Sequence, residues 1–244
     1  MPLRDHFHPP VGHQLPWESL HSGWIARLAE RLNELLPEGY VALDTVRVGG
    51  RLEIDVGTFE GEQPSPPPGA NGPAGGVAVA PVVYRPPPAV GSFPVNFPDV
   101  AEVRVFTDRG GRQLVGAVEL VSPGNKDRGG KLEGFVAKCV GYLTGGASLV
   151  VVDVVTDRRG VVHNDILREL GAPAELEPAD DRTLYATAYR PVVRGERSEV
   201  EVWHAGFAVG DPLPTMPLRL VADDFVPVEL EQTYTDTCRR RRLI

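Results

Sequence analysis

Four residues of this 244-residue chain have types and surroundings that suit chemistry on phosphate: Asp55, Glu119, Lys126 and Lys138. Glu119 lies in the apolar run 114–121, where an unpaired carboxylate would cost several kcal/mol to bury, so it must be ion-paired, protonated or metal-bound. Asp55 lies on the outward row of an earlier alternating strand. If the two strands are neighbours, both carboxylates can point at one spot. Two carboxylates with water and a phosphate oxygen are suitable ligands for Mg²⁺.

The two lysines are candidates for contact with the phosphate. Lys126 ends the polar turn 122–126, which follows the strand of Glu119. In open α/β sheets, ligands bind outside the carboxyl ends of such strands. Lys138 lies on the face of a predicted helix opposite its apolar side, where it shares that face with Lys131 and Tyr142. A lysine beside a carboxylate pair can stabilise negative charge on a phosphate or position an attacking water.

Structural roles compete with each of these hypotheses. Glu119 could form a plain ion pair with Lys126, Lys138 or an arginine, and Asp55 could be a solvated strand residue. Lys138 could extend along the surface with its amine in water.

Periodicity in the sequence predicts the elements that position these residues. Apolar residues at three- and four-residue steps predict helices over 17–36, 131–143 and, at the end, 228–237. Alternating or continuous apolar runs predict strands over 40–48, 51–56, 102–107, 113–122, 148–155, 183–191 and 199–209. The helix 131–143 lies between two buried strands, which is the βαβ pattern of a parallel pair.

These elements predict an α/β (or α+β) protein with a mixed central sheet flanked by helices and with β-rich C-terminal additions. We expect one domain over residues 1–244, with an N-terminal arm at 1–16 and a C-terminal extension with a helix at 211–244. Residues 61–98 hold 11 of the 24 prolines and only two charges, which indicates a long insertion between strands. A connector is the favoured interpretation of this insertion, and docking of a protein partner is the alternative.

Composition narrows the function classes. The net charge of −8 and the pI near 5.3 argue against broad, sequence-blind DNA binding but leave room for a local basic site that contacts nucleic acid. No apolar run is long enough for a membrane span, and the first residues lack a secretory signal. Cys139 and Cys238 form neither a disulfide framework nor a zinc motif, so we expect a cytoplasmic protein. Phosphate-loop, dinucleotide-binding and hydrolase-elbow motifs are missing. The continuous apolar strands could support a homodimer.

Several stretches resemble DUF4058, an uncharacterised family with no established activity. They are 35–40 (LLPEGY), 118–126 (VELVSPGNK), Lys138 with the strand 149–155, and 211–218 (DPLPTMPL), so the resemblance spans nearly the whole chain. A wider similarity is to the Uma2-type, PD-(D/E)XK nuclease-like superfamily. That similarity implies a metal site built from Asp55, Glu119, Lys138 with Tyr142, and Asp153. Pro98-Asp99-Val100 is a rival match to the PD motif of that superfamily, so Asp99 is the alternative to Asp55 as the partner of Glu119. The chain departs from the nuclease motif at Val121, which occupies the usual lysine position, so Lys138 or Lys126 would have to supply the amine.

The sequence therefore favours an Mg²⁺-dependent nuclease or phosphodiesterase, with Asp55 and Glu119 as metal ligands. Lys138, with Lys126 as its substitute, would stabilise the developing negative charge. A non-catalytic binding or scaffold module on a degenerate nuclease-like fold is the alternative, which the displaced lysine and the acidic charge favour.

Overall fold

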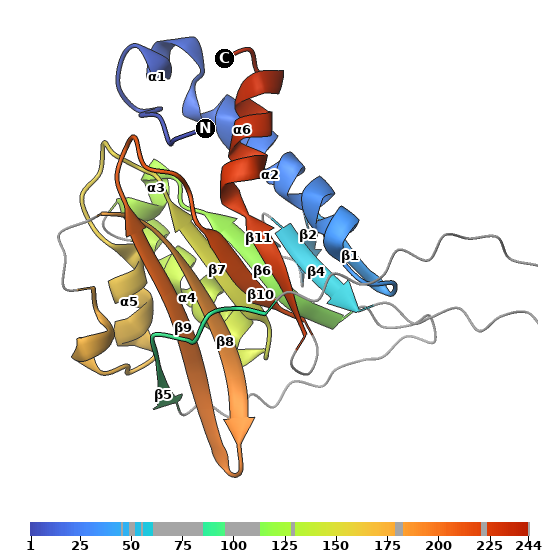
Figure 1. The fold of residues 1–244 in the computed structure, drawn as a ribbon. Coiled ribbons are helices and arrows are strands. Elements are labelled where there is room, and N and C mark those ends of the chain that lie inside the picture. Colours follow the sequence, from blue (N-terminus) through green and yellow to red (C-terminus); the bar gives the residue numbers. More distant parts are fainter. Residues whose placement is uncertain are drawn as a thin grey trace, which may run out of the picture.

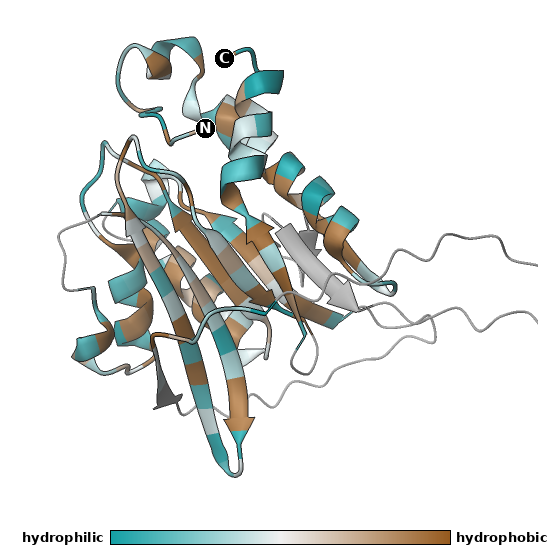
Figure 2. Ribbon diagram, viewed as in Figure 1, coloured by the Kyte–Doolittle hydropathy of each residue, from teal (hydrophilic) through white to brown (hydrophobic). Residues whose placement is uncertain are grey.

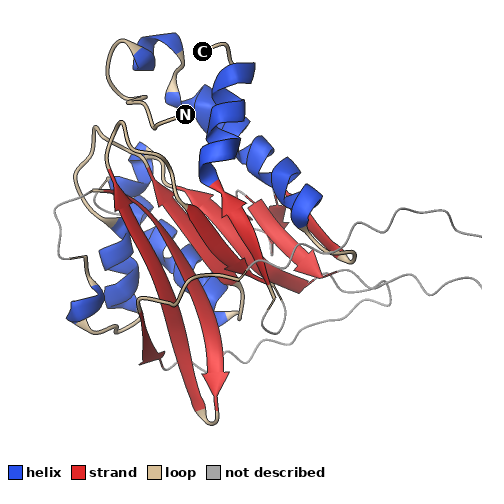
Figure 3. Cartoon of the chain, in the orientation of Figure 1, coloured by secondary structure: helices blue, strands red, loops and turns tan. Residues whose placement is uncertain are grey.

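A seven-stranded mixed sheet in the order β1–β4–β6–β7–β8–β9–β5 forms the centre of the protein (Figure 3). The computed structural model describes residues 1–44, 46–48, 52–54, 56–60, 85–95, 113–127, 130–178, 183–220 and 224–243. β6 and β7 are parallel, and the other neighbouring strands are antiparallel. The strands are β1 (Tyr40–Leu43), β4 (Val56–Glu60), β5 (Gly91–Val95), β6 (Gln113–Leu120), β7 (Ser148–Asp153), β8 (Leu184–Arg194) and β9 (Arg197–Phe207).

Two small sheets and six α-helices complete the described elements. One small sheet pairs β2 (Val46–Val48) with β3 (Leu52–Ile54), and the other pairs β10 (Thr215–Arg219) with β11 (Phe225–Glu229). The helices are α1 (Val11–Gln14), α2 (Trp17–Leu35), α3 (Pro123–Lys126), α4 (Gly130–Thr144), α5 (Val162–Glu169) and α6 (Leu230–Arg240), with a 3-10 turn at Ala174–Leu176. In Figure 1, α4 and α5 lie on one side of the large sheet, whereas β10, β11, α2 and α6 lie on the other.

The core consists of two apolar layers, because residues along β6, β7 and β8 alternate between the two faces of the sheet. Val118 and Leu120 of β6 pack toward α2, α6 and β10. Ala117 and Val121 pack toward α4 and α5. Figure 2 shows the hydrophobic colour concentrated on these central strands. Glu119 belongs to the same row as Ala117 and Val121, and therefore faces the α4 side.

The predicted helices over 17–36 and 131–143 are confirmed as α2 and α4. The apolar positions of α2 are buried, and the helix lies between Pro16 and Pro37. The predicted parallel pair is confirmed as well, since Glu119 of β6 lies opposite Val151 of β7. The mixed sheet flanked by helices agrees with the predicted α+β class. None of the described helices is long and apolar enough to cross a membrane.

Other predictions require correction. The predicted strand 40–48 is two strands, β1 and β2, that pair in different sheets. The predicted C-terminal helix begins at Leu230, because Val228 and Glu229 belong to β11. Residues 91–95, which we assigned to a connector, form β5 and pair with β9. The N-terminal arm predicted at 1–16 needs no correction: Leu3 is buried, and its backbone forms hydrogen bonds with Gly210 and Asp211. The predicted strand 102–107 lies outside the described residues.

Candidate functional site

Glu119 is almost completely buried in the middle of the sheet. It sits one residue before the end of β6, and only 1% of its side chain is exposed. A carboxylate at such a position needs a close positive or hydrogen-bonding partner. Lys138 of α4 provides it: the Lys138 Nζ lies 2.8 Å from the Glu119 Oε2. The crossover helix and the strand before it are therefore joined by a buried ion pair.

Lys138 connects this ion pair with solvent. Its side chain is 18% exposed, against 1% for Glu119. Its amine also lies 5.2 Å from the centre of the Phe135 ring, where a cation is attracted by the aromatic face. Of the two partners, the lysine is therefore the one that contacts solvent.

Lys126 belongs to a second ion pair, which is sealed. Its Nζ lies 2.9 Å from the Asp153 Oδ2, and neither side chain is exposed. The Val155 backbone N–H donates to the Asp153 Oδ1 at 3.0 Å, and the Val155 carbonyl lies 3.5 Å from the lysine amine. Burial raises the pKa of Asp153 to about 6, although Lys126 and the Val155 N–H oppose this increase. Lys126 is therefore the partner of Asp153, at the end of the neighbouring strand, and the described contacts do not join it to Glu119.

The polar turn after β6 is built to deliver Lys126 into the core. The Ser122 Oγ donates to the Asn125 Oδ1 at 2.8 Å, and the Ser122 backbone N–H donates to the same oxygen at 2.9 Å. These bonds form a capping box around α3, in which Pro123 occupies the first helical position. Asn125 therefore acts as a helix cap, and Lys126 at the end of the turn points inward.

Asp55 and Asp99 lie outside the described residues, so the structure does not describe their side chains. The neighbouring register can be stated. Val56, which follows Asp55 in the chain, lies opposite Val118, which precedes Glu119. β4 and β6 are adjacent strands of the central sheet. The sequence analysis required the strands of Asp55 and Glu119 to be neighbours. The strand that begins directly after Asp55 is indeed the neighbour of the strand of Glu119.

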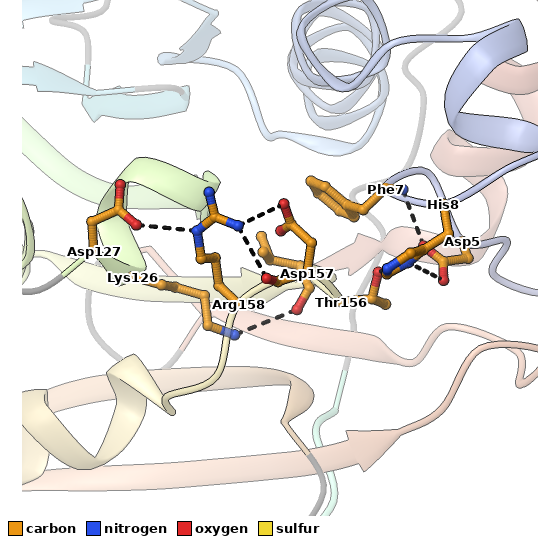
Figure 4. A network of polar contacts seen from close by, with 9 residues as sticks. Asp5, Phe7, His8, Lys126, Asp127, Thr156, Asp157 and Arg158 are labelled. Carbon is orange, nitrogen blue, oxygen red and sulfur yellow. Dashed lines mark hydrogen bonds and ion pairs between the residues drawn. The ribbon is translucent and has the colours of Figure 1, made fainter.

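A surface network lies at the carboxyl ends of β6 and β7, and the sequence analysis missed it (Figure 4). Arg158 contacts Asp127 at 3.1 Å and Asp157 at 3.0 Å. Nearby lies Asp5 of the N-terminal arm. Its carboxylate accepts hydrogen bonds from the Thr156 hydroxyl, after β7, and from the Phe7 backbone N–H of the arm itself. The sequence does indicate residues 156–158 of this network, because they directly follow the predicted buried strand 148–155, and the carboxyl ends of such strands are where ligands bind. The contribution of the arm is not visible in the sequence, since it depends on a contact between residues about 150 positions apart.

Asp5 is held as a carboxylate in this network. Burial opposes its ionisation, but hydrogen bonds from Thr156, the Phe7 backbone and His8 outweigh burial and lower the pKa of Asp5. The His8 Nδ1 lies 2.9 Å from the Asp5 Oδ2. The arm is therefore bound to the end of β7 by a charged group as well as by apolar packing.

A further polar cluster lies between α5 and the strands β8 and β9. His163 is fully buried, its Nδ1 contacts the Tyr189 hydroxyl, and its backbone N–H donates to the Tyr185 hydroxyl at 3.0 Å. Its ring stacks on His204 at a centroid distance of 4.8 Å. Burial, with a smaller effect of His204, lowers the pKa of His163 to about 3, so this imidazole is neutral at physiological pH. These contacts join α5 to β8 and β9 and hold the helix against the sheet.

The described residues do not by themselves form a metal site. They contain no group of three or more His, Cys, Asp or Glu side chains placed to hold an ion. Glu119 supplies one carboxylate, and Asp153 is committed to Lys126. The described residues alone therefore do not fit Mg²⁺, and an ion here would depend on a further ligand such as Asp55. Comparison with known proteins adds no second line of argument, because no family model, curated protein or solved structure matches the chain.

Proposed function

We propose that the protein is a metal-dependent phosphodiesterase with a nuclease-like core, whose site is centred on Glu119 and Lys138. The ion pair between these two residues carries the proposal. The Lys138 Nζ of α4 lies 2.8 Å from the Glu119 Oε2 of β6, and the lysine is partly open to solvent. A lysine amine can stabilise negative charge on a phosphate, and a carboxylate beside it can be a metal ligand.

The order of the elements supports this proposal. Along the chain, the order of the relevant elements is α2, β1, β4, β6, α4 and β7, with β2, β3, β5 and α3 inserted between them. In the sheet, β1, β4 and β6 are antiparallel neighbours, and β7 follows β6 as its parallel neighbour. This is the arrangement that the resemblance to a PD-(D/E)XK core implies, with Glu119 on the third strand and Lys138 on the crossover helix. Asp55, which directly precedes β4 in the sequence, would complete the pattern.

The proposed roles follow from these positions. Asp55 and Glu119 would hold Mg²⁺, which supplies a bound water of lowered pKa and neutralises charge on the phosphate. Lys138 would turn from Glu119 toward the bound phosphate and stabilise the charge that develops there. Lys126 has no direct role in this proposal, because its amine is sealed against Asp153.

The second candidate is a non-catalytic binding or scaffold module. One observation favours it: Glu119 is 1% exposed and already ion-paired, so its charge is balanced without a metal. In that case the Glu119–Lys138 pair would only fix α4 against β6. Removal of either partner would then affect stability and nothing else.

Calorimetric titration with Mn²⁺ and Mg²⁺ separates the two candidates. We expect the wild type to bind a divalent ion and Glu119→Gln to bind it at least ~10-fold more weakly, since the amide keeps the shape but removes the charge. Glu133→Gln, an exposed glutamate of α4, is the matched control and should behave as the wild type. Equal heats for Glu119→Gln and the wild type would rule out the metal site. Asp55→Asn and Asp99→Asn then identify the second ligand.

Lys138→Met gives a further separation. In the enzyme it should retain the ion and lose phosphodiester cleavage, because the lysine acts on the phosphate and not on the metal. In the scaffold module it should lower stability, with no ion binding in any variant. Circular dichroism on each protein confirms that the fold is kept.

A further inference from the structure

The C-terminal end of α6 carries a cluster of arginines, Arg240, Arg241 and Arg242, which we call the arginine end. All three residues are exposed, and the ion pairs of the described residues join none of them to a carboxylate. They differ from Arg239, which pairs with Asp236. In a chain with a net charge of −8, a cluster of three exposed guanidinium groups is a local exception.

The arginine end is held against α2 by the backbone and by packing. The backbone N–H groups of Arg241 and Arg242 donate to carbonyls of the last turn, at 2.9 and 3.0 Å. The Arg241 side chain lies over Gly23: a Cβ at this glycine would come within 3.0 Å of its Nε. Arg240 is close enough to Arg27 of α2 that its charge contributes to lowering the pKa of Arg27, after the larger effect of burial. The cluster is therefore a formed surface on two helices.

This surface lies at the same edge of the molecule as the carboxyl end of β6. His21, two residues before Gly23, places its Nε2 3.4 Å from the Leu120 carbonyl at the end of β6. In Figure 1 the last turn of α6 and the N-terminal part of α2 lie at the end of the molecule toward which β6 and β7 run, where α3 also lies. A ligand that covered this edge could contact the arginine end and the ends of these strands together.

We propose that the arginine end binds the phosphate backbone of nucleic acid. Guanidinium groups match phosphate in a forked, two-bond geometry, and arginine is the preferred residue for this contact. A membrane surface is disfavoured, because such binding also needs exposed apolar side chains. The exposed large apolar residues of the described chain, Val90, Val193 and Val209, lie on neither α2 nor α6. The inference deepens the proposed function by naming its substrate class, and binding is measured apart from cleavage.

A structural role is the competing explanation, since cations near the C-terminal end of a helix are stabilised by the helix dipole. That explanation covers Arg239 and Arg240 in the last turn. It does not require Arg241 and Arg242, which follow the last helical residue.

Fluorescence anisotropy with a labelled DNA duplex of about 20 base pairs tests the proposal on the full chain. We expect Arg240→Gln, Arg241→Gln and Arg242→Gln together to weaken binding at least ~10-fold at about 50 mM salt. The slope of log K against log salt should fall by about 3, because each lost phosphate contact removes roughly 0.9. A variant that changes only Arg240 and Arg242 keeps the contact of Arg241 with Gly23 and should show about two thirds of this decrease in slope.

The matched control replaces three exposed arginines elsewhere, Arg85, Arg159 and Arg197, by glutamine. It removes the same charge from the whole protein and should leave the slope unchanged. Equal weakening in both triple variants would show an effect of net charge alone and overturn the proposal. So would absence of binding by the wild type, or binding to phosphatidylserine vesicles, but not to DNA, that is lost with the arginine end. DNA binding without cleavage would support the surface and count against the proposed enzyme alone.

Discussion

The buried pair of Lys126 and Asp153 allows a prediction whose size depends on pH. In Lys126→Met the side chain keeps a similar shape but loses the amine that lies 2.9 Å from the Asp153 Oδ2. Breaking a fully buried ion pair by removing one partner costs about 3–5 kcal/mol when the other charge remains. We therefore expect a loss of about this size in the unfolding free energy at pH 8.

The pH dependence follows from the pKa of Asp153. In the wild type this pKa is about 6, against an ordinary value of 3.8. A raised carboxyl pKa favours the fold below pH 3.8, and this contribution, about 3 kcal/mol, is lost as the pH rises through about 6. Lys126 opposes the increase, so its removal raises the pKa of Asp153 further. Each tenfold strengthening of proton binding is worth about 1.4 kcal/mol, and between pH 8 and pH 5 the variant gains up to about 4 kcal/mol where the wild type gains about 1.4. The cost of Lys126→Met should therefore shrink by up to about 3 kcal/mol over this range.

Urea denaturation of the wild type and Lys126→Met at pH 5 and pH 8 measures this difference. The double variant Lys126→Met/Asp153→Asn is the control, because it removes both charges and should recover much of the stability at pH 8. A cost that is the same at both pH values would refute the argument. So would a double variant no more stable at pH 8 than the single variant, since the uncompensated carboxylate is then not the cause.

Two further predictions concern the N-terminal arm and the sheet. Burial lowers the pKa of His6 to about 4, so the fold should lose up to about 3 kcal/mol as the pH falls from 6.5 toward 4. His6→Gln should abolish this loss in thermal unfolding at a series of pH values, and an unchanged acid limb would contradict it. Gly116→Ala places a Cβ 3.1–3.2 Å from the Leu218 side chain and should cost about 1–3 kcal/mol. Combined with Leu218→Ala the losses should not add, and full additivity in a double-mutant cycle would disprove the contact.

The sequence predicted the elements that have a clear period and missed those that do not. The helices α2 and α4 and the strands β6 to β9 have apolar patterns long enough to identify them. β5, β10 and β11 are five residues each, and each contains a proline, at 94, 217 and 227, a residue that usually argues against a strand. β5 is an edge strand, and Pro217 and Pro227 lie opposite each other in a separate pair of strands. Proline is tolerated in such positions, and only the tertiary structure reveals them.

The candidate site was predictable in its residues but not in its pairing. The sequence marked Glu119, Lys126, Lys138 and Asp153 as charges in or next to apolar elements, and it left two lysines open for Glu119. The register of the parallel strands decides between them. Glu119 lies opposite Val151, so Asp153 extends two residues further toward the turn from which Lys126 arrives. Lys138 comes instead from the crossover helix and contacts Glu119, one residue before the end of β6. No local pattern contains this information, because it depends on the relative position of two strands and a helix.

The two ion pairs differ in how far their side chains are exposed to solvent. Apolar residues of similar volume often stabilise a core as well as a buried ion pair, so two adjacent pairs call for an explanation beyond stability. The Lys126–Asp153 pair has no exposed atom in either side chain and can only hold the turn after β6 against the end of β7. The Glu119–Lys138 pair is different, because its lysine is 18% exposed. A lysine that left Glu119 would leave a buried carboxylate without a partner, at a cost of several kcal/mol. The proposed function therefore requires that the metal ion compensates Glu119 when Lys138 turns to the phosphate, whereas a structural role requires no such exchange.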